Sequence, residues 1–285
     1  MSLPKLEYCQ ARTIEEALNM WAEKTAARYI AGGTDLLPQL RAGSRAPLRV
    51  VDLKYIENLA KIRQVEDGSV SIGAAASVAQ VAADASVRQH YPILVDCCLS
   101  LGSYPLRNRA TVVGNICNAS PCADTSAALL ALEAVVVTAG PKAKRRIPIG
   151  DFFKGPGESC LQAGELVVEI ILPKATSGGR GHYGRIARRK SVDISTVAVL
   201  VSVLPKGQPR HRLSLLSVAP TPLRVFEAEA VLDERGPEGA SQAAEIARAS
   251  CTPINDVRGS AEYRWDMVGV LTERGVMTLA ESIGR

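Results

Sequence analysis

The chain has 285 residues, of which 47% are hydrophobic and 22% charged, proportions typical of a soluble globular protein with one large or two medium domains. The formal net charge of +5 is small for this length, and no basic stripe is interleaved with aromatic residues, which argues against nucleic-acid binding. No stretch approaches the roughly 18 apolar residues of a membrane span, and the first residues lack the apolar run of a signal peptide. We therefore expect a cytoplasmic protein without a membrane span.

The cysteines predict reduced thiols rather than a disulfide framework. There are seven, an odd number, and they show neither C-x-x-C nor zinc-site spacing. Cys117 and Cys122 form the one suggestive pair. A metal or cluster role for this pair is the less favoured alternative to two passive or redox-sensitive thiols.

The first 56 residues read as a small lobe. Thr13 and Glu16 form a capping box, after which the apolar residues fall on one helical face. A short strand over Tyr29–Ala31 runs into Gly32 and Gly33, where backbone amides can lie against a ligand that a Cβ would push away. A strand over Arg49–Leu53 is expected to close this lobe.

The next segment predicts one strand and two helices. Ser69–Ala74 alternates with period two, like a half-buried strand. Ser77 can cap a helix that continues to about Ala83, and Pro92 can begin another that continues to Leu101.

The stretch Thr111–Leu132 begins polar and becomes an apolar helical pattern. Asp124 can cap that helix, because a short side-chain acceptor satisfies amides left bare at a helix start. Such a loop suits an anion held by hydrogen bonds without a fixed counter-charge. Its hydroxyls, side-chain amides and approachable backbone N–H groups come from Thr111, Gly114, Asn115, Asn118 and Ser120. The alternative is an ordinary polar loop ahead of a core helix.

The remainder predicts further strands, a linker and a second unit. Ala134–Thr138 and Glu165–Pro173 read as strands, Lys142–Arg146 as a solvated hairpin, and Lys174–Gly181 as a linker. Beyond it we expect strands and then helices. The strands are His182–Ile194, Thr196–Leu204 and Leu213–Ala219, and the helices are Val225–Leu232, Ala240–Ser250 and Trp265–Leu279.

The absence of several common motifs reduces the number of function classes that fit this sequence. No G-x-G-x-x-G follows a strand, and neither a phosphate-binding G-x-x-x-x-G-K-[ST] loop nor a G-x-S-x-G elbow occurs. His90, His182 and His211 belong to no His/carboxylate or Ser/His/Asp constellation in the sequence and are interpreted as surface residues. Polar glycine loops without an acid–base set are typical of a protein whose reactivity resides in a bound cofactor.

Five motifs, taken in order, resemble the FAD-binding (medium) subunits of the molybdenum hydroxylases, a family that includes carbon monoxide dehydrogenase and xanthine dehydrogenase flavoproteins. The resemblance extends along nearly the whole chain. The similar segments are Ala31–Pro38, Leu106–Asn115 with its continuation to Asp124, Glu169–Pro173, Tyr183–Ile194 and Tyr263–Arg264.

The resemblance implies an α+β protein with two parts. Residues 1–175 would form a two-lobed FAD-binding domain of the PCMH type, as in vanillyl-alcohol oxidase and MurB, with lobes at about 1–56 and 57–175. Residues 182–285 would form a domain like the C-terminal domain of carbon monoxide dehydrogenase flavoprotein.

The same resemblance assigns FAD contacts and no catalytic or metal-binding residue in this chain. Backbone amides around Gly32, Gly33, Gly114 and Asn115 would hold the diphosphate. The full set of expected contacts is Tyr29, Ile30, Ala31, Gly32, Gly33, Thr34, Asp35, Leu36, Leu101, Thr111, Val112, Val113, Gly114, Asn115, Asp124, Val167 and Arg185.

Three departures from the family pattern bear on these contacts. Val113 stands where the family commonly has glycine. Arg185 stands where lysine is frequent, and it keeps a cation that can stabilise reduced flavin. The benzoyl-CoA reductase branch carries an iron–sulfur cluster on a cysteine-bearing insert, and that insert is absent here.

The function implied is that of an electron-transfer subunit. Electrons would come from [2Fe–2S] clusters in a small partner subunit, fed by a molybdenum–pterin large subunit, and would leave through FAD to NAD, a quinone, a ferredoxin or oxygen. The complex would be a dimer of heterotrimers. The rivals are a stand-alone flavin oxidoreductase of the PCMH type, a scaffold that has lost FAD and, more distantly, a nucleic-acid binder.

Overall fold

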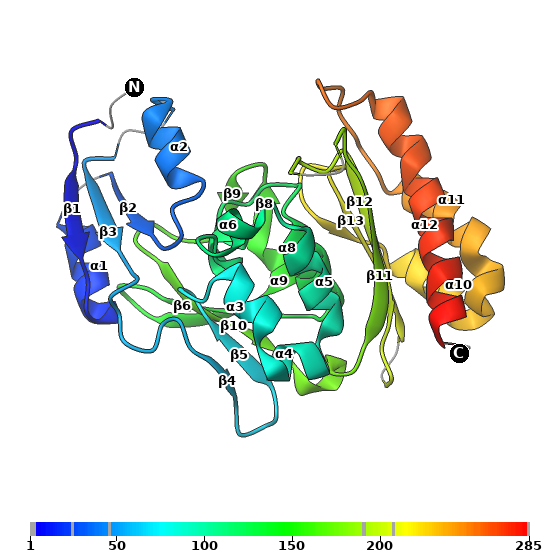
Figure 1. The fold of residues 1–285 in the computed structure, drawn as a ribbon, viewed down its shortest axis with the longest axis horizontal. Coiled ribbons are helices and arrows are strands. Elements are labelled where there is room, and N and C mark those ends of the chain that lie inside the picture. The colour runs from blue at the N-terminus through cyan, green and yellow to red at the C-terminus, as the bar shows by residue number, and fades with distance from the viewer. Residues whose placement is uncertain (1–3, 24–25, 45–46, 190–191, 207–208, 284–285) are drawn as a thin grey trace.

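The computed structural model describes residues 4–23, 26–44, 47–189, 192–206 and 209–283. Helices and strands are mixed along the chain, as the predicted α+β class requires. Three bodies follow one another from left to right in Figure 1: a small first lobe, a larger second lobe, and a C-terminal layer of sheet and helices.

The first lobe is a parallel sheet with strand order β1-β3-β2. Parallel neighbours need a crossover, and α1 lies between β1 and β2 in the chain. The predicted capping box is confirmed in substance: the Thr13 hydroxyl accepts from the Glu16 amide at 3.1 Å, and the Glu16 carboxylate accepts from the Arg12 amide at 2.7 Å. The elements are β1 (Glu7–Gln10), α1 (Ile14–Ala22), β2 (Ala27–Ile30), α2 (Leu36–Arg41) and β3 (Arg49–Asp52).

The second lobe is built on an antiparallel sheet with strand order β4-β5-β10-β6-β7. Ile72, Ile170 and Val136 face one another across its three middle strands and are fully buried. The elements are β4 (Ile62–Gln64), β5 (Val70–Gly73), α3 (Val78–Ala83), α4 (Ala85–His90), α5 (Pro92–Ser100), α6 (Tyr104–Arg107), α7 (Val112–Cys117), α8 (Asp124–Ala131), β6 (Val135–Ala139), β7 (Lys144–Pro148), α9 (Ile149–Phe152), β8 (Phe153–Gly155), β9 (Glu158–Ser159) and β10 (Leu166–Leu172).

Two predicted helix starts in this lobe are confirmed. The Ser77 hydroxyl accepts from the Gln80 amide while the Gln80 side chain accepts from the Ser77 amide, a complete capping box at the start of α3. Pro92 is the first residue of α5, where its missing N–H leaves no helical bond unmade.

The C-terminal layer is an antiparallel sheet with order β11-β12-β13-β14, covered on one side by α10, α11 and α12. Along β12, Ala198 and Leu200 belong to the large core shared with the second lobe, whereas Val197, Val199 and Val201 belong to a separate core under the helices. Both faces of this strand are thus buried, which explains its unbroken apolar sequence. The elements are η1 (Lys174–Thr176), β11 (Arg180–Ile186), β12 (Val197–Val203), β13 (His211–Leu216), β14 (Leu223–Arg224), α10 (Phe226–Arg235), η2 (Gly236–Gly239), α11 (Ala240–Ala249) and α12 (Ala261–Ile283).

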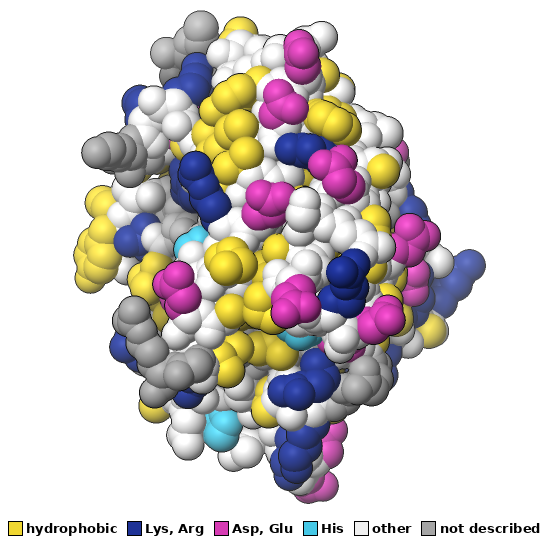
Figure 2. All heavy atoms as spheres, turned by 90° about the vertical axis from the view of Figure 1, so that its right-hand side faces the viewer, with side chains coloured by type: hydrophobic (Ala, Val, Ile, Leu, Met, Phe, Trp, Pro, Cys, Tyr) yellow, Lys and Arg dark blue, Asp and Glu magenta, His cyan; other side chains and the backbone are white. Residues whose placement is uncertain are grey.

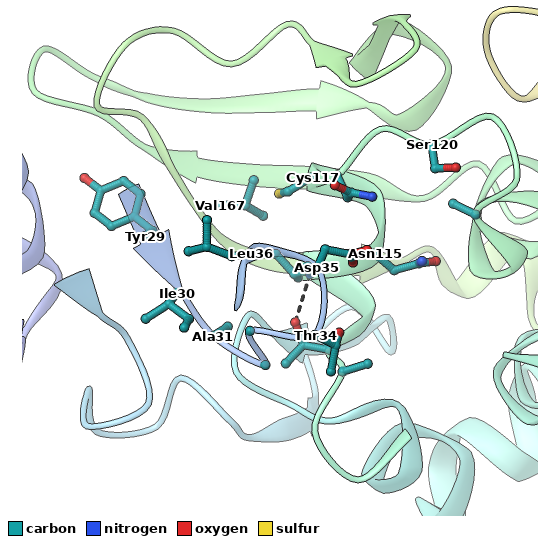
Figure 3. A pocket seen from close by; sticks show the side chains of 18 of the residues that line it. Tyr29, Ile30, Ala31, Thr34, Asp35, Leu36, Asn115, Cys117, Ser120 and Val167 are labelled. Carbon is teal, nitrogen blue, oxygen red and sulfur yellow. Dashed lines mark hydrogen bonds between the residues drawn. The ribbon is translucent and has the colours of Figure 1, made fainter. Parts of the chain in front are cut away.

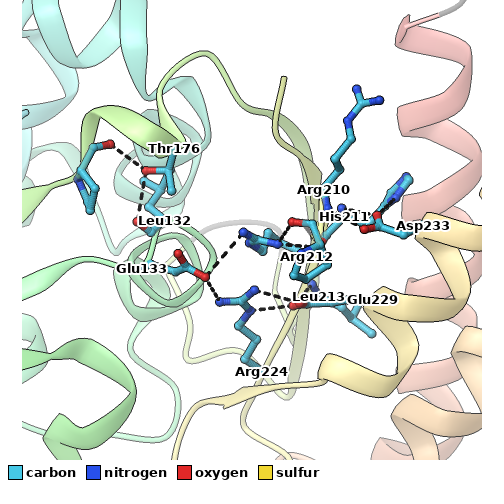
Figure 4. A network of polar contacts seen from close by, with 12 residues as sticks. Leu132, Glu133, Thr176, Arg210, His211, Arg212, Leu213, Arg224, Glu229 and Asp233 are labelled. Atoms are coloured by element: carbon cyan, nitrogen blue, oxygen red, sulfur yellow. Dashed lines mark hydrogen bonds and ion pairs between the residues drawn. The ribbon is translucent and has the colours of Figure 1, made fainter. Parts of the chain in front are cut away.

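A partly buried ion-pair network, in which Glu133 is exposed and Glu229 buried, joins the second lobe to the C-terminal layer (Figure 4). Arg224 on β14 donates from Nη1 to Glu133, just after α8, at 2.8 Å, and from Nε to Glu229 on α10 at 2.7 Å. Glu229 also accepts from the Leu213 amide at 3.0 Å and is fully buried. Because every charge in this network has a partner, its burial does not leave an isolated ion.

The face of the C-terminal layer that is drawn in Figure 2 carries side chains of both charges. On the face that Figure 2 shows, acidic and basic side chains are interspersed with apolar ones. Among the described residues, no helix has both the length and the apolar composition needed to cross a membrane.

Two predictions for the segment from residue 174 to residue 194 are wrong: the length of a strand and the flexibility of a linker. The strand predicted over His182–Ile194 ends at Ile186, because Ile186 pairs with Val197 and the chain must turn between them. The flexible linker predicted over Lys174–Gly181 is anchored instead: the Thr176 hydroxyl donates to the Leu132 carbonyl at 3.1 Å. The Gly178 amide donates to the His90 carbonyl at 2.7 Å.

Candidate functional site

A cavity of about 510 Å³ lies where the two lobes and the C-terminal layer meet (Figure 3). Its size falls within the range of pockets for cofactors and other small molecules. The described residues that line it are Arg28, Tyr29, Ile30, Ala31, Gly32, Gly33, Thr34, Asp35, Leu36, Gln39, Leu53, Ala74, Leu101, Leu106, Ala110, Thr111, Val113, Gly114, Asn115, Cys117, Asn118, Ser120, Cys122, Ala123, Asp124, Leu161, Glu165, Leu166, Val167, Asp193 and Ile194.

The two glycine-bearing loops meet at this cavity. A Cβ built on Gly32 would lie 2.2 Å from the carbonyl oxygen of Arg109 and 2.9 Å from the Cα of Ala110. Gly32 therefore serves a different purpose from the one expected, because its missing side chain lets the first loop touch the backbone ahead of α7. Gly33 has a φ of +74°, which glycine adopts without strain.

Backbone amides at both loops remain available to a ligand. Within the described chain, the amides of residues 32–35 donate to no protein acceptor. The same holds for Val113 in the first turn of α7, whereas its neighbour Val112 is fully buried and does not line the cavity. Groups of this kind, gathered at a cavity, form an anion-binding concavity.

The amides assigned to the second loop need a correction. Gly114 donates its N–H to the Thr111 hydroxyl at 2.8 Å, and Asn115 donates its N–H to the Thr111 carbonyl at 3.0 Å. Thr111 is the N-cap of α7 and therefore occupies both groups. The unbonded amide that lines the cavity here is that of Val113, one residue before Gly114.

The first lobe closes onto the second through Tyr29. Tyr29 lines the cavity (Figure 3). Its phenol donates to the Gly164 carbonyl, just ahead of β10, at 2.9 Å. Burial raises the pKa of Tyr29, so the phenol remains protonated at neutral pH. This bond holds the cavity wall across a separation of 135 residues.

Two carboxyl groups in the wall have pKa values shifted in opposite directions. Burial raises the pKa of Asp35, whose side chain makes no capping bond at the start of α2. Burial also acts to raise the pKa of Glu165, but hydrogen bonds from Arg145, Thr138 and the Gln162 amide outweigh it, and the net shift is downward. Glu165 is therefore the more firmly ionised of the two.

Asp124 does not cap α8, contrary to the prediction. It is the first residue of the helix, and the N-cap position belongs to Ala123. Its Oδ1 instead accepts from the Tyr183 phenol at 2.7 Å and from the Ser195 hydroxyl at 3.4 Å, both in the C-terminal layer. Burial raises the pKa of Asp124, and these bonds oppose the shift.

Fifteen of the seventeen predicted contact residues line the cavity, and Val112 and Arg185 do not. Val112 is fully buried between two lining residues. Arg185 donates from Nη1 to the Ser100 carbonyl at 2.7 Å and from Nη2 to the Asp193 carbonyl at 3.0 Å. Arg185 thus links two segments next to the cavity by hydrogen bonds, and its charge lies close to the cavity without lining it.

Several lining residues were not among the predicted contacts. Asn118 and Ser120 carry a signal in the sequence, since they belong to the polar loop, and Asp193 and Ile194 belong to a recognised motif. The others are apolar or lie within elements whose direction the sequence does not reveal. They include Arg28, Gln39, Leu53, Ala74, Leu106, Ala110, Ala123, Leu161 and Leu166.

Cys117 and Cys122 both line the cavity. Burial raises the pKa of Cys117 to about 12, so its thiol is protonated at neutral pH. In the described part of the chain, no three His, Cys, Asp or Glu side chains come together as a metal site.

One histidine departs from its predicted surroundings. His211 Nδ1 lies 2.7 Å from Asp233 Oδ1, so a His/carboxylate pair does exist in the C-terminal layer. None of the described cavity-lining residues is a histidine.

The residues present fit an elongated dinucleotide. The cavity wall offers unbonded amides for a diphosphate, Asn115 and Ser120 for hydroxyl groups, and Leu101 and Val167 as apolar surface for a ring. Together with a two-lobed α+β fold, this donor set is typical of a dinucleotide-binding protein.

Comparisons with known proteins agree with that class. Residues 4–175 match the model of the FAD binding domain in molybdopterin dehydrogenase, and residues 182–279 match the CO dehydrogenase flavoprotein C-terminal domain. The putative xanthine dehydrogenase FAD-binding subunit XdhB of Escherichia coli K12 is 31% identical over 286 residues, covering 97% of each chain. The carbon monoxide dehydrogenase medium chain of Hydrogenophaga pseudoflava is 30% identical, covering 96% of each.

Solved structures match equally fully. Carbon monoxide dehydrogenase from Hydrogenophaga pseudoflava superposes with a TM-score of 0.93 at 30% identity, covering 99% of both chains. Quinoline 2-oxidoreductase from Pseudomonas putida 86 superposes with a TM-score of 0.91 at 26% identity, also covering 99% of both. The chain belongs to the family of FAD-binding oxidoreductase subunits of the molybdopterin dehydrogenases.

Proposed function

We propose that this chain is the electron-transfer flavoprotein subunit of a multisubunit molybdenum hydroxylase, with FAD bound in the cavity between its lobes. The observation that carries the proposal is the convergence of the 31–35 loop and the start of α7 on one cavity. Nearly full-length similarity to FAD-binding subunits supports it.

The diphosphate of FAD would lie against the amides of residues 32–35 and Val113, which have no acceptor in the described chain. Ribityl or ribose hydroxyls would be met by Asn115, Ser120 and Asp124, and the ring system by the apolar wall at Leu101. When bound, FAD supplies the uptake and release of electrons. The residues of the chain bind it, orient it and exclude water, roles that need no acid or base.

The remaining predicted contacts belong to the same proposal. Ile30, Ala31 and Leu36 would pack on the cofactor from the first lobe, and Val167 from β10. Arg185 would favour reduced flavin through its charge rather than through contact.

We extend the proposal to the division of the chain. An FAD-binding domain would occupy residues 1–175, with lobes at about 1–56 and 57–175, and a second domain residues 182–285. The matched ranges of the two family models support this division.

The partners would be a small subunit with [2Fe–2S] clusters and a large subunit with a molybdenum–pterin centre, assembled as a dimer of heterotrimers in the cytoplasm. Names of relatives such as "medium chain" and "complex subunit alpha" support an assembly of unlike subunits.

Co-purification from the native cell tests the proposal. A tag on this chain should bring down two further subunits, and the complex should contain FAD, iron and molybdenum. The isolated chain should bind FAD in a one-to-one ratio and yet oxidise no aldehyde or N-heterocycle. Turnover by the isolated chain would instead favour the stand-alone flavin oxidoreductase, and absence of a flavin absorbance band from the complex would refute the proposal.

A further inference from the structure

The Asp124 carboxyl group is held from the other side of a boundary between two parts of the molecule. Asp124 begins α8 in the second lobe, whereas both donors to its Oδ1, Tyr183 on β11 and Ser195 just ahead of β12, belong to the C-terminal layer. No other residue of the described chain donates a hydrogen bond to its Oδ2, and Asp124 lines the cavity; the one further hydrogen bond to the carboxylate comes from the Asp124 amide itself. One oxygen is therefore committed to the protein, and the other is left for a ligand.

Tyr183 is itself fixed firmly. It pairs with Leu200 in the antiparallel β11–β12 ladder and packs against the large hydrophobic core. Two residues further along the strand, on the same face, Arg185 is tied to the Ser100 and Asp193 carbonyls at 2.7 and 3.0 Å. The phenol is thus presented to Asp124 from a rigid strand.

A carboxylate held by one rigid donor keeps its rotamer, and a fixed acceptor loses less conformational entropy when it binds a hydroxyl group. We infer that Tyr183 is a positioning residue, which orients Asp124 so that its free Oδ2 accepts a hydroxyl hydrogen bond from the bound FAD. The inference rests on the proposed function. It gives the C-terminal layer a part in cofactor binding that acts through Asp124, in addition to its packing on the second lobe.

Substitution of Tyr183 by phenylalanine removes the donor and keeps the ring. We expect Tyr183→Phe to raise the dissociation constant for FAD about tenfold, the effect of losing one hydrogen bond to a charged group. The measurement is titration of the deflavinated protein with FAD, followed by flavin fluorescence, together with the melting temperature of the deflavinated protein.

Tyr91→Phe is the matched control. Tyr91 is buried, and its phenol donates to the Leu172 and Pro173 carbonyls at 3.0 and 3.1 Å, away from the cavity. It should lower the melting temperature and leave the FAD dissociation constant unchanged. If Tyr183 had a structural role alone, Tyr183→Phe would behave in the same way, and the inference would be wrong.

A double-mutant cycle tests whether Tyr183 acts through Asp124. Asp124→Asn should weaken FAD binding by itself, and adding Tyr183→Phe should weaken it no further. Additive losses would overturn the inference. Should Tyr183→Phe not fold, Ser195→Ala, which removes the second donor to Asp124, takes its place in the cycle with the same expected outcome.

The two hypotheses fail in different ways. If the unsubstituted chain takes up no FAD, the proposed function fails and this inference falls with it. If the unsubstituted chain binds FAD and Tyr183→Phe binds it as tightly, the proposed function stands and the positioning role is excluded.

Discussion

Gly32 lies where the loop after β2 touches the backbone just ahead of α7. The nearest atoms to a Cβ at this position would be the Arg109 carbonyl oxygen and the Ala110 Cα, which are backbone atoms that cannot rotate away. The contact sets the separation of the two loops, and with it the width of the cavity between them. The requirement for glycine thus comes from protein packing rather than from contact with a cofactor.

Gly32→Ala should therefore push the two loops apart. We expect it to lower the free energy of unfolding by about 1–3 kcal/mol, as overpacking does, and to raise the FAD dissociation constant by about tenfold or more. Urea denaturation and FAD titration measure the two effects. Gly150→Ala is the control, because a Cβ there meets nothing within 4 Å and should change neither quantity appreciably. Unaltered FAD affinity in Gly32→Ala would contradict the role given to this contact.

Helix α7 is short, and its N-terminus depends on one side chain. Thr111 accepts the Gly114 N–H and so fixes the first turn, in which the amide of Val113 has no acceptor in the described chain. Helix α3 begins in the same way at Ser77, but that hydroxyl lies outside the cavity lining. The two helices thus offer equivalent caps with different expected consequences.

Thr111→Ala and Ser77→Ala should each lower stability by about 1 kcal/mol, the usual value of a lost N-cap. Loss of the Thr111 cap should also weaken FAD binding, because the first turn of α7, which carries the unbonded Val113 amide, would fray. Parallel chemical denaturation and FAD titration of both variants distinguish the effects. Equal FAD affinity in the two variants would show that the start of α7 does not take part in the site.

Across the whole molecule, several carboxylates have pKa values lowered by partners from other elements. In Glu165, Asp233 and Asp256 burial acts to raise the pKa, but hydrogen bonds from partner groups outweigh it. A group whose pKa is lower in the folded state stabilises the fold fully above its unfolded-state pKa, about 4.3 for glutamate. That stabilisation is lost as the pH falls through the lower folded-state value.

We therefore expect the free energy of unfolding to fall as the pH drops below about 4.3. Glu165→Gln should be less stable than the unsubstituted chain at pH 7, by on the order of 2 kcal/mol, and less sensitive to acid. Urea denaturation between neutral pH and the onset of acid unfolding measures both. Glu15→Gln, on the exposed face of α1, provides a control with unchanged pH dependence. An identical acid profile in Glu165→Gln would contradict the assignment.

Local patterns predicted most of the secondary structure. The capping residues Thr13 and Ser77 each mark a predicted helix start, and Pro92 begins α5, because capping and proline chemistry act within a few residues. Thr111 also caps a helix, α7, in a stretch that was predicted to be a polar loop. The Arg-rich segment after β11 was misread as strand because its turn is set by pairing with β12.

The candidate site shows the same division. The polar residues and glycines of the two loops can be recognised in the sequence, and fifteen of the seventeen expected residues line the cavity. The roles of individual atoms could not be read in this way. Gly114 has its amide occupied by Thr111, and Asp124 accepts from Tyr183, a residue 59 positions away.

Composition, motif order and local chemistry along the chain were sufficient to establish its α+β class, its family resemblance and the two loops that matter. The three-dimensional packing settled which amides remain free, that Gly32 joins the loops, and that the C-terminal layer supplies donors to the cavity wall. The physical reason is range. Propensities and caps act over a few residues, whereas hydrogen bonds such as Tyr29–Gly164 and Tyr183–Asp124 form between segments that come together when the cores pack.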